Sequence, residues 1–176
     1  MCGWKNVADP ADDFDWERSQ AETLSYGTGP IVDHTLGTSE GNHRSVQPPH
    51  SEPNLPPPPG WYIFIEASYP RLPDDKAVLS LPHVHKTGPR CELRFWYHME
   101  GSGIGSLVAT ATDHAGTVVA SWRRDGEQSA QWAQGGLYMP HADDVTITFE
   151  AVRGSNYQGD IALDDIEFLH CGMDGR

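Results

Sequence analysis

The sequence has no long hydrophobic run, and this absence sets the first limit on its function. No stretch of about 18 consecutive apolar residues occurs in its 176 residues, whereas a transmembrane helix needs about 20. The chain starts Met-Cys-Gly-Trp, without the basic and apolar regions of a secretory signal peptide. We therefore expect that this domain does not itself insert into a membrane and that these 176 residues include no signal peptide.

Positive charge is also scarce. Lysine and arginine number 12 against 25 aspartates and glutamates, which gives a formal net charge of −13. Nucleic-acid binding and attraction to anionic lipid both depend on basic side chains, so we expect neither type of partner. The acidic excess is compatible with a hard cation such as Ca²⁺, which binds carboxylate oxygens. Alternatively, it serves only to keep the protein soluble.

Sequence motifs for catalysis and for zinc are missing. Neither a G-x-S-x-G elbow nor an H-E-x-x-H helix occurs, so we predict no catalytic residues and no enzymatic activity. The three cysteines, Cys2, Cys91 and Cys171, show no C-x-x-C spacing, which argues against a zinc site. No Asn-x-Ser/Thr glycosylation site occurs either.

Three cysteines allow at most one internal disulfide. Cys91 and Cys171 each lie at an end of a predicted strand, which makes them the natural pair and leaves Cys2 either free or paired with a cysteine outside these residues. Because disulfides persist in oxidising compartments, this pairing predicts an extracellular protein. The alternative is three reduced thiols in a cytosolic domain.

No segment shows a sustained helical period, while 18 glycines and 14 prolines favour short strands and turns. The clearest alternation covers residues 91–99, where Cys91, Leu93, Phe95, Tyr97 and Met99 share one face. We predict about eight to ten short strands in an all-β sandwich or jelly roll. Other predicted strands cover residues 61–67, 77–81 (ending at Pro82), 107–112, 117–122, 131–139 and 145–151, and residues 29–35 look extended.

The last predicted strand, residues 159–171, carries an irregularity. Ile161 and Leu163 share one parity, whereas Ile166 and Phe168 share the other. A one-residue slip turns every following side chain to the opposite face of a sheet. The sequence therefore predicts a β-bulge at Asp164-Asp165.

Two segments look like loops. Residues 9–16 contain four aspartates around Phe14 and Trp16, and we expect the two aromatic side chains to anchor this loop to the core. Residues 47–60 contain seven prolines, which cannot donate to a sheet ladder. We interpret this stretch as a spacer loop, with a ligand for a proline-recognising domain as the alternative.

The motifs CGW, DDFDWER, GPIVDHT, YIFIEAS, CELRFWYHMEGSGIGSL, FEAVRG and GDIALDDIEF occur in this order. Together they resemble a MAM domain, the extracellular module of meprins, neuropilin-type receptors and receptor tyrosine phosphatases, also found in zonadhesin. The resemblance implies a jelly-roll β-sandwich of two antiparallel sheets over residues 2–171. It makes residues 41–60 an inserted proline-rich loop and residues 172–176 a tail.

The resemblance also implies a function. It implies a non-catalytic adhesion or protein-interaction module with protein partners, a second copy included, at the cell surface or outside the cell. The parent would be a larger secreted or membrane-anchored protein. A jelly-roll carbohydrate-binding module is the alternative, with Trp96, Trp122 and Trp132 as an aromatic platform or as half-buried core.

Family members usually pair their first cysteine with the second and the third with the fourth. The resemblance makes Cys2 the second, Cys91 the third and Cys171 the fourth. The strand that usually carries the first cysteine is missing from this sequence, which leaves Cys2 unpaired and one sheet edge open.

Some family members hold Ca²⁺ or Na⁺ near the chain ends. Carried over to this sequence, the ligands are Asp12, Asp13, Asp164 and Asp165, completed by carbonyls and water. The alternative is that these aspartates cap turns and pair with Arg18 or Arg153. A transition-metal site at His83, His85 and His98 is a weaker possibility, because isolated histidines are usually surface residues.

Overall fold

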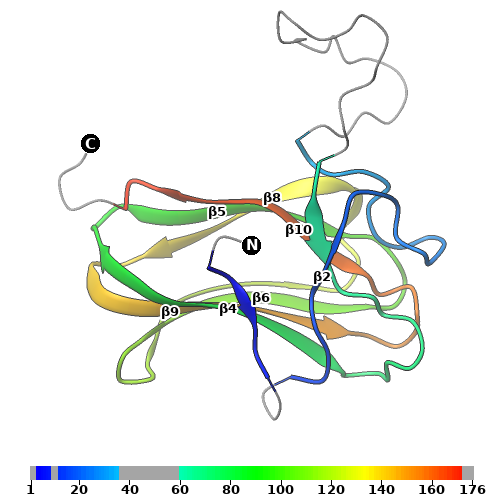
Figure 1. The fold of residues 1–176 in the computed structure, drawn as a ribbon, viewed down its shortest axis with the longest axis horizontal. Helices are drawn as coiled ribbons and strands as arrows, with labels where there is room; N and C mark the ends of the chain where they lie inside the picture. The colour runs from blue at the N-terminus through cyan, green and yellow to red at the C-terminus, as the bar shows by residue number, and fades with distance from the viewer. Residues whose placement is uncertain (1–2, 9–11, 36–59, 172–176) are drawn as a thin grey trace, which may run out of the picture.

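Two five-stranded sheets, both wholly antiparallel, lie face to face in the computed structural model (Figure 1). Residues 3–8, 12–35 and 60–171 are described. One sheet has the order β1-β4-β9-β6-β7 and the other β2-β3-β10-β5-β8. The strands are β1 (Lys5–Asn6), β2 (Glu17–Ser19), β3 (Tyr62–Phe64), β4 (Lys76–Thr87), β5 (Cys91–Met99), β6 (Ile104–Asp113), β7 (Val118–Asp125), β8 (Ser129–Met139), β9 (Ala142–Arg153) and β10 (Ile161–Leu169).

The core lies between the two sheets and is built from the inward side chains of alternating strands. The predicted face of β5 is buried throughout, from Cys91 to Met99. Phe95 of β5 meets Phe149 of β9 edge to face, with ring centroids 4.9 Å apart. The all-β jelly-roll class is therefore confirmed, because period-two burial on both sheets produces one shared interior.

The predicted bulge in β10 is also confirmed. The pairing of β10 with β5 shifts register between Asp164 and Glu167, and Asp165 has a positive φ of 44°. Ile161 and Leu163 are fully buried before the bulge, and Ile166 packs against the core after it. The bulge thus changes the phase of the strand while the chain keeps apolar contacts with the interior.

The prediction that a strand ends at Pro82 is wrong, since β4 continues to Thr87. Leu81 pairs with Ile147 and Val84 with Val145, so Pro82 and His83 together face one residue of β9. This is a β-bulge. Proline has no backbone N–H to donate, and a bulge is one of the places in a sheet where this does not interrupt the hydrogen bonds between strands. His83 has a φ of 60° at this point. His83 and His85 consequently lie in a strand and not in a loop.

Two further predictions need correction. The strand expected over residues 61–67 covers only Tyr62–Phe64. After it, the amide of Ile65 still bonds to the carbonyl of Ile161, and the amide of Ala67 bonds to the side chain of Asp160. Residues 29–35 form bends and turns and no strand. They lie on the outer face of the second sheet, where the indole of Trp132 donates to the carbonyl of Val32 over 3.0 Å.

Some predictions fall outside the described residues. These are the state of Cys2, the tail 172–176 and the proline-rich loop 41–60 apart from Gly60. In the ranges that are described, no helix has the length and apolarity to cross a membrane.

Candidate functional site

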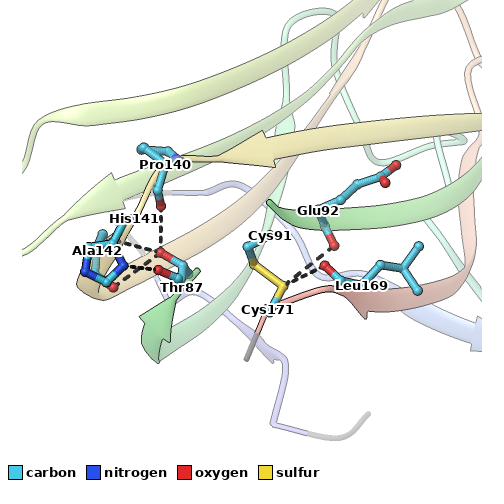
Figure 2. The surroundings of a disulfide bond; sticks show 8 residues. All are labelled: Thr87, Cys91, Glu92, Pro140, His141, Ala142, Leu169 and Cys171. Carbon is cyan, nitrogen blue, oxygen red and sulfur yellow. Dashed lines mark hydrogen bonds between the residues drawn. A yellow bond between two sulfur atoms is a disulfide. The ribbon is translucent and has the colours of Figure 1, made fainter. Parts of the chain in front are cut away.

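The strand β10 carries the features that the sequence singled out, one after another along its length. Cys171, two residues beyond the end of β10, forms a disulfide with Cys91, the first residue of β5 (Figure 2). The two strands are antiparallel neighbours, and Leu169 pairs with Glu92 just before the bridge. The disulfide therefore closes the end of a two-strand ladder, between the two cysteines that the sequence predicts as partners.

A hydrogen-bond cluster lies beside the disulfide (Figure 2). The buried hydroxyl of Thr87 donates to the carbonyl of Pro140 over 2.7 Å and accepts from the amide of Ala142 over 2.9 Å. These bonds tie the end of β4 to the turn between β8 and β9. This end of the sandwich is thus fixed by a covalent bond and by a polar network.

The acidic loop before β2 is anchored as the sequence predicts. Phe14 and Trp16 are buried, and the indole of Trp16 donates to the carbonyl of Ala77 over 3.2 Å. The carboxylate of Asp13 accepts from the amide of Lys76 over 2.9 Å, so it caps the start of β4. Arg71 lies 4.5 Å above the ring of Phe14.

Asp164 and Asp165 hold the segment that crosses the outer face of the sheet. The amide of His34 donates to Asp164 over 2.8 Å, and the hydroxyl of Thr35 donates to Asp165 over 2.8 Å. The imidazole Nδ1 of His34 lies 2.7 Å from the carboxylate of Asp165, and its ring stacks on Trp96 at 3.7 Å. Burial raises the pKa of Asp164 above its usual range.

The structure divides the four predicted cation ligands into two pairs. Asp12 and Asp13 belong to the loop that caps β4, whereas Asp164 and Asp165 face residues 34–35. Among the residues that are described, no group of three or more histidine, cysteine, aspartate or glutamate side chains is arranged to hold a metal. The positions of Asp13, Asp164 and Asp165 match the turn-capping alternative, and binding of a cation stays a prediction.

Asp160, immediately before β10, is the buried carboxylate that sequence reasoning missed. Its side chain is fully buried and accepts a hydrogen bond of 2.8 Å from the amide of Ala67. Burial raises the pKa of this carboxyl to about 7. The sequence contains no signal for this burial, since it arises from loops that are distant along the chain.

The loops around Asp160 meet at the end of the sandwich opposite the disulfide. We call residues 20–30, 66–75, 100–103 and 154–159 the end loops. Ser25 and Ser68 share a hydrogen bond of 2.6 Å between their hydroxyls. The amide group of Gln158 donates to the carbonyl of Tyr26 over 3.3 Å. A Cβ added at Gly101, where φ is +128°, would lie 2.4 Å from the carbonyl oxygen of Gln158. Close approach at this position therefore requires glycine.

The three tryptophans proposed as a sugar platform do not share one exposed surface. Trp122 packs between the sheets, edge to face with Phe95 at 5.0 Å. Trp96 lies under the ring of His34, and Trp132 contacts Tyr62 with centroids 6.0 Å apart. All three are half-buried, as expected for sandwich tryptophans that contribute to packing.

The histidines are likewise separated. His83 and His85 both face Asp144, with shortest distances of 3.1 Å and 3.8 Å. His98 lies in the other sheet, where burial lowers its pKa and its ring meets Trp132 at 5.6 Å. The predicted trio does not converge on one metal position.

A groove of about 330 Å³ opens next to the bulge. Its walls are largely apolar, with Trp4, Trp61 and Leu163 among them, and Asp164 and Asp165 at its border. Among the described residues, those that line the groove include no serine, cysteine or histidine.

Comparison with known proteins gives consistent matches in sequence. The profile of the family described as "MAM domain, meprin/A5/mu" matches residues 42–172. The MAM domain-containing glycosylphosphatidylinositol anchor protein 1 of Gallus gallus is 34% identical over 172 residues, and the match covers 94% of this chain and 16% of that protein. MAM domain-containing protein 2 of Homo sapiens is 34% identical over 154 residues, 87% of this chain and 19% of that protein. The chain thus spans less than a fifth of the length of these relatives.

Solved structures match in fold alone. The K1 cleaved adhesin domain of Lys-gingipain from Porphyromonas gingivalis W83 has a TM-score of 0.57 at 13% identity, over 98% of this chain and 93% of that one. The K2 cleaved adhesin domain of the same protein has a TM-score of 0.51 at 14% identity, over 96% of this chain and 90% of that one. At such low identity the likeness supports the sandwich architecture.

Proposed function

The chain belongs to the MAM domain family, and from this membership we propose that it is a non-catalytic protein-interaction module of an extracellular protein. The family match over residues 42–172 is the observation that carries the proposal. MAM domains typically mediate contacts between proteins, either between copies of the same protein or with a different one.

The extracellular location is supported by the disulfide between Cys91 and Cys171. Disulfides form and persist in oxidising compartments such as the secretory pathway and the cell surface. The names of the relatives in Gallus gallus and other vertebrates include a glycosylphosphatidylinositol anchor. We infer that this chain is one module of a larger secreted or membrane-anchored protein.

The absence of a role in catalysis is supported by how the ionisable side chains are used. Asp13, Asp164 and Asp165 accept hydrogen bonds from neighbouring loops, and Asp160 is sealed in the interior. Carboxylates engaged in this way are used to hold the loops in place. The geometry therefore favours binding at a surface over chemistry in a pocket.

A binding screen tests the proposal. The domain is displayed as a pentamer to raise its avidity and is applied to an array of defined recombinant ectodomains that includes the domain itself. We expect reproducible binding to at least one ectodomain. A glycan array is run in parallel, and binding to glycans without binding to any ectodomain would contradict the proposal in favour of a carbohydrate-binding module.

A further inference from the structure

We propose that the end loops form the protein-binding surface of the domain, and that the partner is a different protein with an apolar patch bordered by lysine and arginine. This inference rests on the proposed function and adds to it the location of the contact and the chemistry of the partner.

Exposed large apolar side chains gather on the end loops. Among the described residues, the five most exposed are Leu24 (95%), Tyr69 (92%), Tyr26 (87%), Tyr138 (71%) and Leu72 (64%). Four of these five lie on the end loops, and Tyr157 adds a side chain that is 51% exposed. Single exposed apolar residues are common, whereas a group of them on one part of a surface marks an interaction site.

The loops that carry these side chains touch one another. Ser25, between Leu24 and Tyr26, bonds to Ser68, the neighbour of Tyr69. Gln158, the neighbour of Tyr157, donates to the carbonyl of Tyr26. Figure 1 shows the same loops at the end of the sandwich opposite the one where β10 ends. The exposed side chains therefore belong to one surface.

This surface is held in place before any partner binds. The carboxylate of Asp160 accepts from the amide of Ala67, while the buried Arg153 donates from Nε to the carbonyl of Ala67 over 2.8 Å. Thr28 donates to the carbonyl of Glu100 over 2.8 Å and accepts from the amide of Asp160. Loops fixed in this way lose little conformational entropy on binding.

The composition of the surface resembles that of protein-binding loops in general. Tyrosine provides a large amphipathic contact area with few rotatable bonds, and serine and glycine adapt around it. Tyr26 lies between Ser25 and Gly27, Tyr69 follows Ser68, and Tyr157 follows Asn156. Tyrosine is also over-represented among residues that dominate the free energy of protein–protein binding.

Charge around the surface points to a basic and therefore different partner. The end loops contain five acidic residues and one basic residue. The basic residue is Arg71, whose guanidinium already lies over the ring of Phe14. The acidic residues are Glu22, Glu66, Asp74, Asp75 and Glu100. Two copies joined through this surface would bring like charges together, and their repulsion would oppose the contact. A partner with lysine and arginine at its rim is attracted instead.

The test compares two variants against the ectodomains that bind in the array. The first combines Tyr26→Ser, Tyr69→Ser and Tyr157→Ser. The matched control is Tyr138→Ser, an exposed tyrosine on β8 beside the disulfide end. We expect the triple variant to raise Kd by a factor of at least about 100, since each contact tyrosine contributes on the order of a tenfold change. The control should leave Kd within about twofold.

Two readouts separate a lost contact from a lost fold and probe the partner's charge. The melting temperature of the triple variant should match that of the parent, because all three side chains are exposed. The association rate should fall as NaCl rises, and Glu22→Lys should slow it further. An association rate that does not depend on salt would overturn the proposed basic partner.

The remaining outcomes are distinguishable. If the triple variant binds an ectodomain as tightly as the parent, the surface is wrong and the proposed function stands. If only self-binding is found and the triple variant abolishes it, the partner is a second copy and the inference of a different protein is wrong. If no ectodomain binds the parent, both the proposed function and this inference fail.

Discussion

The amide of Ala67 donates a hydrogen bond of 2.8 Å to the carboxylate of Asp160, which lies 93 residues further along the chain. Asp160 is fully buried, and the backbone amide of Asp160 donates in turn to the hydroxyl of Thr28. One residue thus joins two of the end loops, residues 66–75 through its side chain and residues 20–30 through its backbone amide. Stability and surface geometry at this end of the molecule should therefore depend on the ionisation state of Asp160.

The first prediction concerns the pH dependence of stability. Burial raises the pKa of Asp160 to about 7, while an aspartate in an unfolded chain has a pKa of about 3.9. Between these values the folded state retains a proton that the unfolded state has released, so this residue makes stability fall as pH rises from about 4 to 7. The effect ends above the folded-state pKa.

Asp160→Asn should remove this slope, because the amide oxygen still accepts from Ala67 and carries no charge. Relative to the parent, the variant should gain up to about 4 kcal/mol in free energy of unfolding between pH 4 and pH 8, since one pKa unit corresponds to ~1.4 kcal/mol. Urea unfolding across this range measures the difference. Asp15→Asn, at an exposed position, is the control. A stability difference that is independent of pH would show that Asp160 is ionised throughout.

The disulfide provides a second prediction. Cys91 and Cys171 are separated by 80 residues, and cross-linking a loop of this length stabilises a fold by about 4 kcal/mol in the chain-entropy treatment. Replacing both by serine should lower the free energy of unfolding by about that amount. Cys2→Ser should have no effect, because we predict that Cys2 is unpaired. Non-reducing peptide mapping that finds Cys2 in a disulfide with Cys91 or Cys171 would overturn the pairing.

Trp16 provides a third prediction. Its side chain is 2% exposed, and its indole bonds to the carbonyl of Ala77. Trp16→Ala should destabilise the domain by about 3–5 kcal/mol, as expected for the loss of a large buried aromatic residue. Trp61→Ala removes a side chain that is 53% exposed and that contacts Arg18. Apart from the loss of that contact, it should lower the free energy of unfolding by less than about 1 kcal/mol. Equal effects of the two substitutions would contradict the anchoring role of Trp16.

The cation that the family resemblance suggests is tested by calorimetry. Ligand binding to the folded state alone raises the melting temperature, so bound Ca²⁺ predicts an increase with added CaCl₂ that is reversed by chelator. Asp165→Ala should abolish the increase, whereas Asp15→Ala should preserve it. A melting temperature that does not respond to Ca²⁺ would mean that Asp164 and Asp165 serve only to hold residues 34–35.

The alternation of apolar and polar residues was sufficient to predict strands and the faces that they bury. The alternation of residues 91–99 gave the buried face of β5, and the change of parity at Asp164-Asp165 gave the bulge in β10. The same reasoning ended β4 too early at Pro82, because a proline looks like a strand terminus unless the partner strand that accommodates a bulge is known. Pairing partners are not visible in one sequence.

The candidate site was less accessible to sequence reasoning for a similar reason. His98 falls on the outward face of β5 and is nevertheless buried, because Trp132 and the segment ending at His34 cover that face. Asp160 is buried by loops that come from residues 23–28 and 66–67. Exposure of Tyr26, Tyr69 and Tyr157 on one surface likewise depends on contacts between distant segments, so no spacing along the chain reveals it.

The most direct test of this account is hydrogen–deuterium exchange of the domain with and without the ectodomain that binds it most tightly in the array. Residues 22–27, 66–72 and 155–158 should exchange more slowly in the complex, while residues 137–142 beside the disulfide should not change. Protection confined to the disulfide end, or to the outer faces of the sheets, would contradict the assignment of the end loops as the binding surface.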